Sequence, residues 1–120
     1  MIEEYKLGLI TIDGRDYNYD VGVLWDGQAF EWERDEDNKI KLEDLTDILE
    51  FKPEVIVIGN GEAGQSQVEE EVKETIEEQG IKLIIDKTEQ ATKTFNIRCE
   101  DSIEEEGKLE RIVGLFVLDY

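Results

Sequence analysis

The middle of the chain reads Val55-Ile56-Val57-Ile58-Gly59-Asn60-Gly61, a continuous β-branched run that ends in a glycine-rich turn. Four consecutive β-branched residues leave no polar side for solvent, which predicts a strand buried on both faces. Such a strand belongs to a sheet covered by helices on both sides, so the run indicates an α/β domain. Just before it, Leu42, Leu45 and Ile48 recur at helical spacing and predict a short amphipathic helix over 43–51.

The carboxyl side of the run predicts alternating helices and strands. A narrow apolar stripe predicts a helix over 68–79, and residues 81–85 read as a second buried strand. A further helix over 89–98 leads to a uniformly apolar strand over 112–118. Strand–helix–strand units of this length predict parallel strands joined by right-handed crossovers.

The amino-terminal third predicts a β-meander. Asp13-Gly14 and Asp26-Gly27 are strong hairpin signals, because both residue types tolerate positive φ. They separate alternating segments over 5–12, 17–25 and 28–34, which we expect to form three antiparallel strands. The fold class is therefore α/β, with an antiparallel meander followed by βαβ units around a central mixed sheet.

Length and charge limit the possible functions. The chain has 120 residues, a length typical of one domain, so residues 1–120 are expected to form a single unit. It carries 13 Lys and Arg against 32 Asp and Glu, a formal net charge of −19. A surface this acidic repels phosphates, which argues against nucleic acid and anionic membranes. The acidity itself has three interpretations: salt adaptation, a basic protein partner, and an ordinary solubilising charge, which is the favoured one.

Composition also predicts no metal, no cofactor and no targeting signal. The chain has no His, and Cys99 is its only cysteine, so a His-ligated metal, a cysteine-rich zinc cluster and an intrachain disulfide are not expected. No apolar run approaches the roughly 18 residues that span a bilayer. The segment Met1–Lys6 does not resemble a signal peptide, so the expected location is cytoplasmic.

The glycine-rich turn has two interpretations. Gly59, Gly61 and Gly64 form a G-x-G-x-x-G pattern after a buried strand, as in dinucleotide-binding folds. However, the next helical stripe starts late, Glu62 adds negative charge, and only one βαβ unit surrounds the motif. A structural turn with an adjoining small-ligand pocket, in which Asn60 takes part, is the favoured interpretation.

A second polar turn is predicted to lie beside the first. Lys87 and Thr88 follow a parallel strand at its carboxyl end, the edge where open α/β sheets bind ligands. Thr88, or Asp86, is alternatively a helix cap. If the pocket belonged to an enzyme or a nucleotide-binding protein, Lys87 would supply a cation and Thr88 and Asn96 hydrogen bonds. Asp20 or Asp86 would then be the base.

The residues described so far also resemble a known family. Ordered matches occur over 7–14, at Tyr17 and Asp20, over 53–61 with Gly64, and from Thr88 to Asn96. Together they resemble the Mth938-like family, a domain of unknown function, over nearly the whole chain. The family usually has Thr or Ser between the first two loop glycines and often a His in the last strand. This chain departs from that pattern at both places.

The resemblance implies a three-layer α/β domain and no established enzymatic activity. Family members include a mitochondrial complex I assembly factor and an adipogenesis-associated protein, which implies an interaction or assembly role. We therefore expect no catalytic residues and a non-enzymatic interaction module that exists as a monomer or weak homo-oligomer. Glutamates of the 68–79 helix are the predicted partner face, with Glu69, Glu74 and Glu77 as its representatives.

Overall fold

A five-stranded mixed sheet forms the centre of the molecule, with the predicted β-branched run as one of its inner strands. The protein is described here by a computed structural model that covers residues 1–34, 38–106 and 110–118. The strand order is β5-β4-β10-β7-β9. The bounds are β4 Val21–Val23, β5 Ala29–Glu31, β7 Val55–Asn60, β9 Lys82–Asp86 and β10 Ile112–Val117. Strands β7, β9 and β10 run parallel, whereas β4 is antiparallel to β10.

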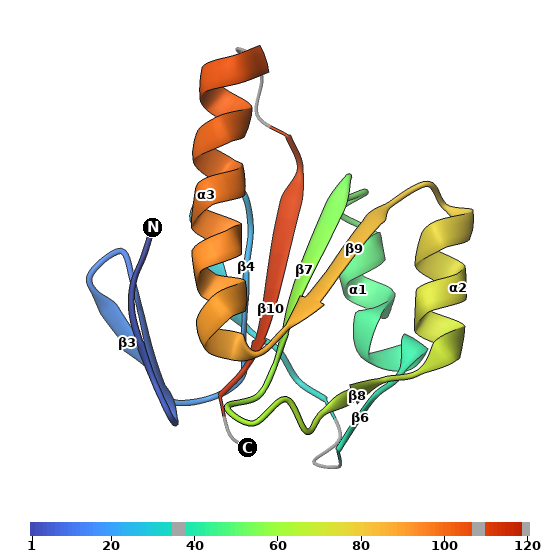
Figure 1. Ribbon diagram of the computed structural model, residues 1–120, viewed down its shortest axis with the longest axis horizontal. Helices are drawn as coiled ribbons and strands as arrows, with labels where there is room; N and C mark the ends of the chain where they lie inside the picture. The colour runs from blue at the N-terminus through green and yellow to red at the C-terminus, as the bar shows by residue number, and fades with distance from the viewer. Residues whose placement is uncertain (35–37, 107–109, 119–120) are drawn as a thin grey trace.

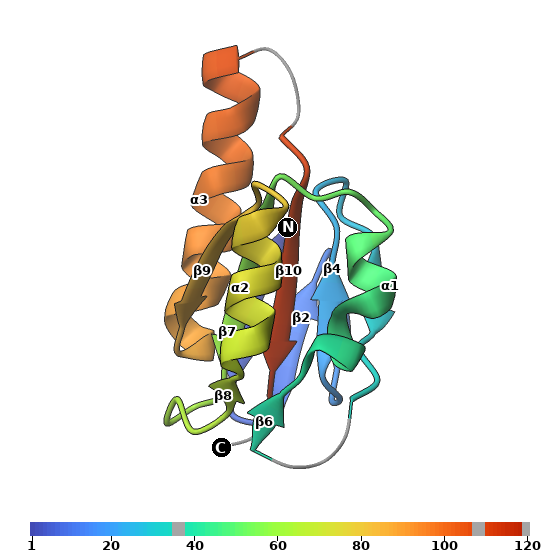
Figure 2. The ribbon, with the colours of Figure 1, turned by 90° about the vertical axis from the view of Figure 1, so that its right-hand side faces the viewer.

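Helices cover both faces of this sheet, as the apolar run in β7 predicts. Figures 1 and 2 show α3 (Thr88–Glu106) on one face, and α2 (Glu70–Glu78) with α1 (Thr46–Leu49) on the other. Successive β7 side chains point to opposite faces. Val55 and Val57 pack in the cluster that contains the α3 residues, and Ile56 and Ile58 pack in the cluster with α1 and α2.

A second, three-stranded sheet completes the layer that contains α3. Strands β1 (Ile2–Lys6), β2 (Leu9–Ile12) and β3 (Arg15–Tyr17) are antiparallel neighbours. Asn96 of α3 holds this sheet, since its amide nitrogen donates to the Ile2 carbonyl at 2.8 Å and its oxygen accepts from the Ile2 N–H at 3.1 Å. The three-layer α/β architecture with a central mixed sheet is thereby confirmed.

The predicted meander is wrong in detail, although both Asp-Gly turns are present. The segment 5–12 is interrupted by a turn at Leu7–Gly8, where Gly8 has φ of +80°, and gives two strands. The segment 17–25 breaks between β3 and β4, so its alternating residues lie in two different sheets. Alternation of apolar and polar residues is a local pattern, and it does not show which sheet a strand joins.

The helices also differ from their predicted bounds. The 43–51 segment begins as a 3₁₀ turn, η1 (Leu42–Leu45), before the single α-helical turn of α1. Helix α2 begins only at Glu70, because β8 (Gln67–Val68) pairs in parallel with β6 (Lys39–Ile40). Helix α3 extends well beyond the predicted residue 98.

Strand β9 lies at the edge of the sheet and is not fully buried. Its pattern predicts a strand covered on both faces, but β7 is its only neighbour among the described strands. The side chains of Leu83, Ile84 and Ile85 are each partly exposed. An apolar run shows that two faces are covered, but it does not show whether both edges are paired.

Gly59 is required by the close packing between β7 and α3. A Cβ at this position would lie 2.8 Å from the Cα of Thr88 and 3.1 Å from the ring of Phe116. We therefore expect Gly59→Ala to lower the free energy of unfolding by about 1–3 kcal/mol, the usual cost of overpacking. Urea unfolding followed by circular dichroism measures this change, and an unaltered midpoint would contradict the packing argument.

Candidate functional site

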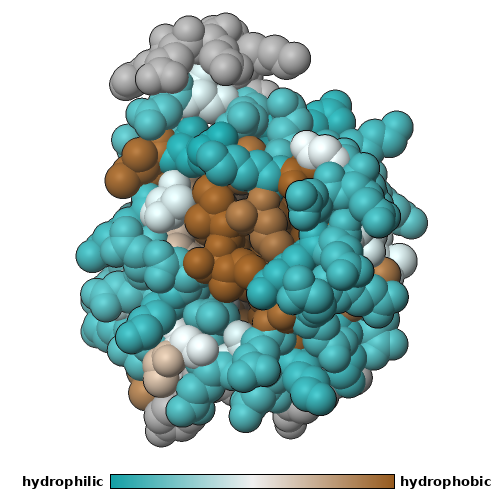
Figure 3. Space-filling view, turned by 45° about the vertical axis from the view of Figure 1, so that its right-hand side comes forward, coloured by the Kyte–Doolittle hydropathy of each residue, from teal (hydrophilic) through white to brown (hydrophobic). Residues whose placement is uncertain are grey.

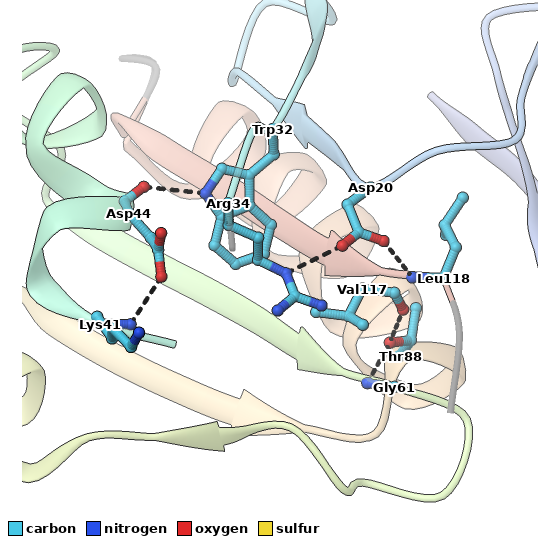
Figure 4. Close-up of polar contacts among 9 residues, drawn as sticks. All are labelled: Asp20, Trp32, Arg34, Lys41, Asp44, Gly61, Thr88, Val117 and Leu118. Atoms are coloured by element: carbon cyan, nitrogen blue, oxygen red, sulfur yellow. Dashed lines mark hydrogen bonds and ion pairs between the residues drawn. The ribbon is translucent and has the colours of Figure 1, made fainter. Parts of the chain in front are cut away.

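The glycine loop is bonded directly to the first turn of α3. The Gly61 N–H donates to Thr88 Oγ1 at 2.9 Å, and the Thr88 hydroxyl donates to the Val117 carbonyl at 2.6 Å, as Figure 4 shows. The Thr88 N–H in turn donates to the Gly61 carbonyl at 3.1 Å. One fully buried side chain therefore joins the ends of β7 and β10 to the start of α3.

These contacts correct two expectations about Thr88. It does not cap α3, because it is the first helical residue and its hydroxyl bonds to other strands and loops. It is also inaccessible to a ligand in this structure, with an exposed fraction of 0%. Gly59 and Thr88 are in close contact and leave no space for a ligand between them.

A groove instead lies on the other side of the glycine loop, toward α2. It has a volume of about 540 Å³ and is bordered by β6, β8, β9 and the first turns of α2. Asn60 and Gly64 are the two predicted loop residues that line it. The other lining residues are Lys39, Ser66, Gln67, Val68, Glu69, Glu70, Lys73 and Ile85.

Asn60 carries an unsatisfied acceptor at this groove. Among the described residues, its Oδ1 is buried and has no hydrogen-bond partner. This oxygen and Lys87 both border Gly64, since a Cβ built there would lie 3.5 Å from Asn60 Oδ1 and 3.4 Å from Lys87 Cγ. The structure therefore brings Asn60, Gly64 and Lys87 together, although Lys87 does not line the groove.

Charges around the groove are mixed. Lys73 Nζ lies 3.9 Å from Glu70 Oε2 on the same helix. The groove thus has two lysines and two glutamates on its walls, which is a polar but nearly neutral lining.

Two predicted site residues lie elsewhere and hold the fold together. Asn96 bonds to Ile2, as described above. Asp20 Oδ2 accepts from Arg34 Nε at 2.9 Å, and Asp20 Oδ1 accepts from the Leu118 N–H at 3.0 Å (Figure 4). The side chain of Arg34 is only 5% exposed, so this ion pair is largely removed from water. Neither residue lines the groove, and a ligand role for either stays a prediction.

Sequence reasoning missed the residues that complete this second cluster. The Arg34 guanidinium lies 5.6 Å from the Trp32 ring centroid, and Trp32 Nε1 donates to the Asp44 carbonyl at 3.0 Å. Arg34 is one of only 13 cations in the chain. A scarce arginine beside a tryptophan in an acidic sequence was the available signal for a buried ion pair.

Cys99 has the properties of an inert core residue. It is 3% exposed and packs with the residues beneath α3. Burial raises the pKa of its thiol to about 11, and the carboxylates of Glu100 and Glu110 add to the shift. Because the thiolate is the nucleophilic form, Cys99 is almost entirely in its unreactive form near neutral pH.

The glutamates predicted as a partner face lie on α2 or just before it. Val72 and Ile76 point into the core, which leaves the acidic residues of the helix outward. Glu74 and Glu77 are exposed, and Glu69 is partly buried as the residue that precedes the helix.

The fold and loop geometry define a class of protein: a three-layer α/β domain in which a glycine turn is bonded to a helix start. The chain belongs to the family described as proteins of unknown function DUF498/DUF598, whose profile matches residues 2–106. The Mth938-like domain predicted from the sequence is thereby confirmed. No curated protein matches the sequence.

Solved structures share the fold over the full chain. The conserved hypothetical protein PH1505 from Pyrococcus horikoshii OT3 matches with a TM-score of 0.81 and 23% identity, covering 100% of this chain and 99% of its own. The protein MT938 matches with a TM-score of 0.79 and 21% identity, covering 100% and 98%. A Bartonella henselae protein, described as an outer membrane protein, gives 0.76 and 18%, covering 99% and 94%. At these identities the likeness shows the fold alone.

In the part of the chain that the structure describes, none of the helices has the length and apolar character needed to cross a bilayer. The same residues include no group of three or more carboxylate or thiol side chains arranged to bind a metal ion.

The Thr88 hydroxyl is expected to stabilise the fold through hydrogen bonds that a methyl group in its place cannot make. Thr88→Val should leave the Gly61 N–H and the Val117 carbonyl buried without their partner, at a cost of about 1–3 kcal/mol in unfolding free energy. Thr88→Ser keeps the hydroxyl and is the matched control, with a smaller loss. Urea denaturation of both variants tests this, and equal losses for Val and Ser would contradict it.

Proposed function

We propose that this chain is a protein-interaction module of the assembly type, and that α2 presents its acidic face to a basic partner. The observation that carries the proposal is the exposed row of carboxylates on a helix with a single lysine. The exposed members are Glu70, Glu71, Glu74, Glu77 and Glu78.

This row opposes helix formation by itself. Glu70 and Glu74, and likewise Glu74 and Glu78, are four residues apart, a spacing at which like charges destabilise a helix. The apolar contacts of Val72 and Ile76 offset that cost within the fold. The glutamates that repel one another would attract a basic partner, and the electrostatic field of α2 would steer that partner toward the helix.

Charge reversal on α2 is expected to remove partner binding without unfolding the domain. The variant carries Glu69→Lys, Glu74→Lys and Glu77→Lys, and the measurement is quantitative capture of basic proteins from a cell extract. Recovery should fall at least about tenfold, equivalent to about 1.4 kcal/mol. Raising the salt from about 50 to about 300 mM should also weaken capture by the unmodified protein.

A matched variant separates the α2 face from total charge. Glu4→Lys, Glu31→Lys and Glu33→Lys make the same change in net charge on exposed residues of β1 and of the segment around β5. This control should recover partners normally. Equal recovery by both triple variants would refute the α2 face as the docking surface.

A second candidate function rests on Asn60. Its buried Oδ1 has no partner among the described residues, and it borders the 540 Å³ groove. If the Asn60 amide turned toward the groove, a small polar ligand with a hydrogen-bond donor would satisfy that oxygen, and Lys39 lies on the groove wall to meet its polar groups. A nucleotide-binding protein or a small-molecule enzyme would use this groove in place of the filled space beside Thr88.

Thermal unfolding against a panel of nucleotides and small polar metabolites tests this candidate. A ligand present at about 100 times its dissociation constant should stabilise the protein by about 2.7 kcal/mol. The shift should disappear in Asn60→Ala and persist in Asn18→Ala, which changes an exposed asparagine outside the groove. No shift with any compound in the panel would count against a ligand role.

A further inference from the structure

The outer edge of β9 has backbone groups that no described strand pairs. The Lys82 N–H donates to the Glu54 carbonyl at 3.0 Å, which places the peptide groups of Lys82 and Ile84 toward β7. Because successive residues of a strand direct their N–H and C=O to opposite sides, those of Leu83 and Ile85 face the open edge. The edge therefore offers two donors and two acceptors in an extended conformation.

The side chains beside this edge are apolar. Leu83 and Ile85, with Ile81, line a hollow of about 330 Å³ whose remaining walls are Lys73 and Glu77 of α2. In Figure 3, the face on which β9 comes forward shows a hydrophobic patch surrounded by hydrophilic residues. An incoming strand would find hydrogen-bond partners along the edge and apolar contacts next to it.

At both ends of β9, the neighbouring backbone groups already have hydrogen-bond partners. The Ile81 N–H donates to the Ile76 carbonyl at 3.1 Å, and the Lys87 N–H donates to Asp86 Oδ1 at 2.9 Å. The Lys87 carbonyl accepts from the Ala91 N–H at 2.8 Å. Only the segment from Lys82 to Asp86 can therefore pair with another strand, which limits the contact to a short segment.

We propose that β9 is the docking edge for an extended, basic segment of a partner protein, which adds to the central sheet as a sixth strand. This inference rests on the proposed function, because it specifies how the basic partner of α2 binds. Lys73 lies beside Glu70, and within the described residues no ion pair engages Glu77 at the rim of the hollow. A lysine or arginine of the added strand would meet that carboxylate.

Charge favours a basic segment over a second copy of this chain. Two copies joined edge to edge at β9 would place both α2 helices on the same face of the joined sheet, next to each other. Each α2 carries the exposed glutamate row, and each chain has a net charge of −19, so the two would repel. A basic segment experiences the opposite force.

A proline substitution at the edge tests the backbone role. In Leu83→Pro the lost N–H faces outward, so the fold should persist, whereas an incoming strand loses a donor. The probe is a labelled peptide, Lys-Val-Lys-Val-Lys-Val-Lys, titrated by fluorescence anisotropy. We expect Leu83→Pro to weaken its binding at least about tenfold. Ile84→Pro, whose N–H faces β7, should instead lower the thermal midpoint.

If Leu83→Pro does not fold, altered peptides test the same point with the unmodified protein. A peptide with proline in place of the central valine keeps the charge but cannot form a complete strand, and a glutamate–valine peptide keeps the strand pattern but reverses the charge. Neither should bind. Hydrogen exchange should slow at the Leu83 and Ile85 amides when the lysine peptide is added.

The outcomes separate this inference from the proposed function. Peptide binding could survive both Leu83→Pro and the proline in the peptide but be lost when Glu69, Glu74 and Glu77 are changed to Lys. That result would overturn strand addition but would still support the acidic face of α2 as the docking surface. Absence of binding, or binding that ignores that reversal, would overturn the basic-partner proposal itself. Loss of binding in all three tests, with protection of the two edge amides, supports strand addition.

Discussion

The hydroxyl of Thr88 is the contact on which the arrangement of this domain depends. It accepts a hydrogen bond from the loop after β7 and donates one to the end of β10, while its own backbone begins α3. The contact is possible only because Gly59 lets the strand approach the helix. The glycine pattern that resembles a phosphate-binding turn therefore brings a helix, and not a nucleotide, against the strand.

This arrangement moves the accessible surface away from the position usual in open α/β sheets. Such sheets bind ligands beyond the carboxyl ends of their strands, at the turn between neighbouring units. Here that position is closed between Gly59 and Thr88, and Asp20 closes the end of β10 from the other side. The flank formed by α2, β8 and β9 stays accessible, and it has the groove, the acidic row and an unpaired strand edge.

Much of the fold follows from local pattern. The β-branched run of β7, the Asp-Gly turns and the helical stripe of α2 are read from a few adjacent residues, and they correctly predict an α/β domain with a mixed sheet. The division of the amino-terminal strands between two sheets does not follow from such patterns. It depends on pairings between distant segments, such as β4 with β10, which alternation within a strand does not record.

The candidate site shows the same limit. Asn60 and Gly64 are correctly placed together because they share one turn. Thr88, Asn96 and Asp20 each hydrogen-bond to a backbone group far away in sequence, and Asp20 also pairs with the Arg34 side chain. Their residue types suggest a chemical role, but these contacts show a structural one. Buried polar side chains bond mostly to backbone, and a sequence does not reveal which backbone.

The contact between Asn96 and Ile2 has a consequence for how the chain folds during synthesis. It joins residues that are 94 positions apart, and β4, which pairs with the nearby β5 on one side, gains its other neighbour only when β10 is present. The amino-terminal strands leave the ribosome first but acquire their packing surface only when the last strand and helix have emerged. Native pairings of such long range make folding slow and leave early strands uncovered. The high density of negative charge in the chain would make incompletely synthesised chains repel one another and so oppose their association.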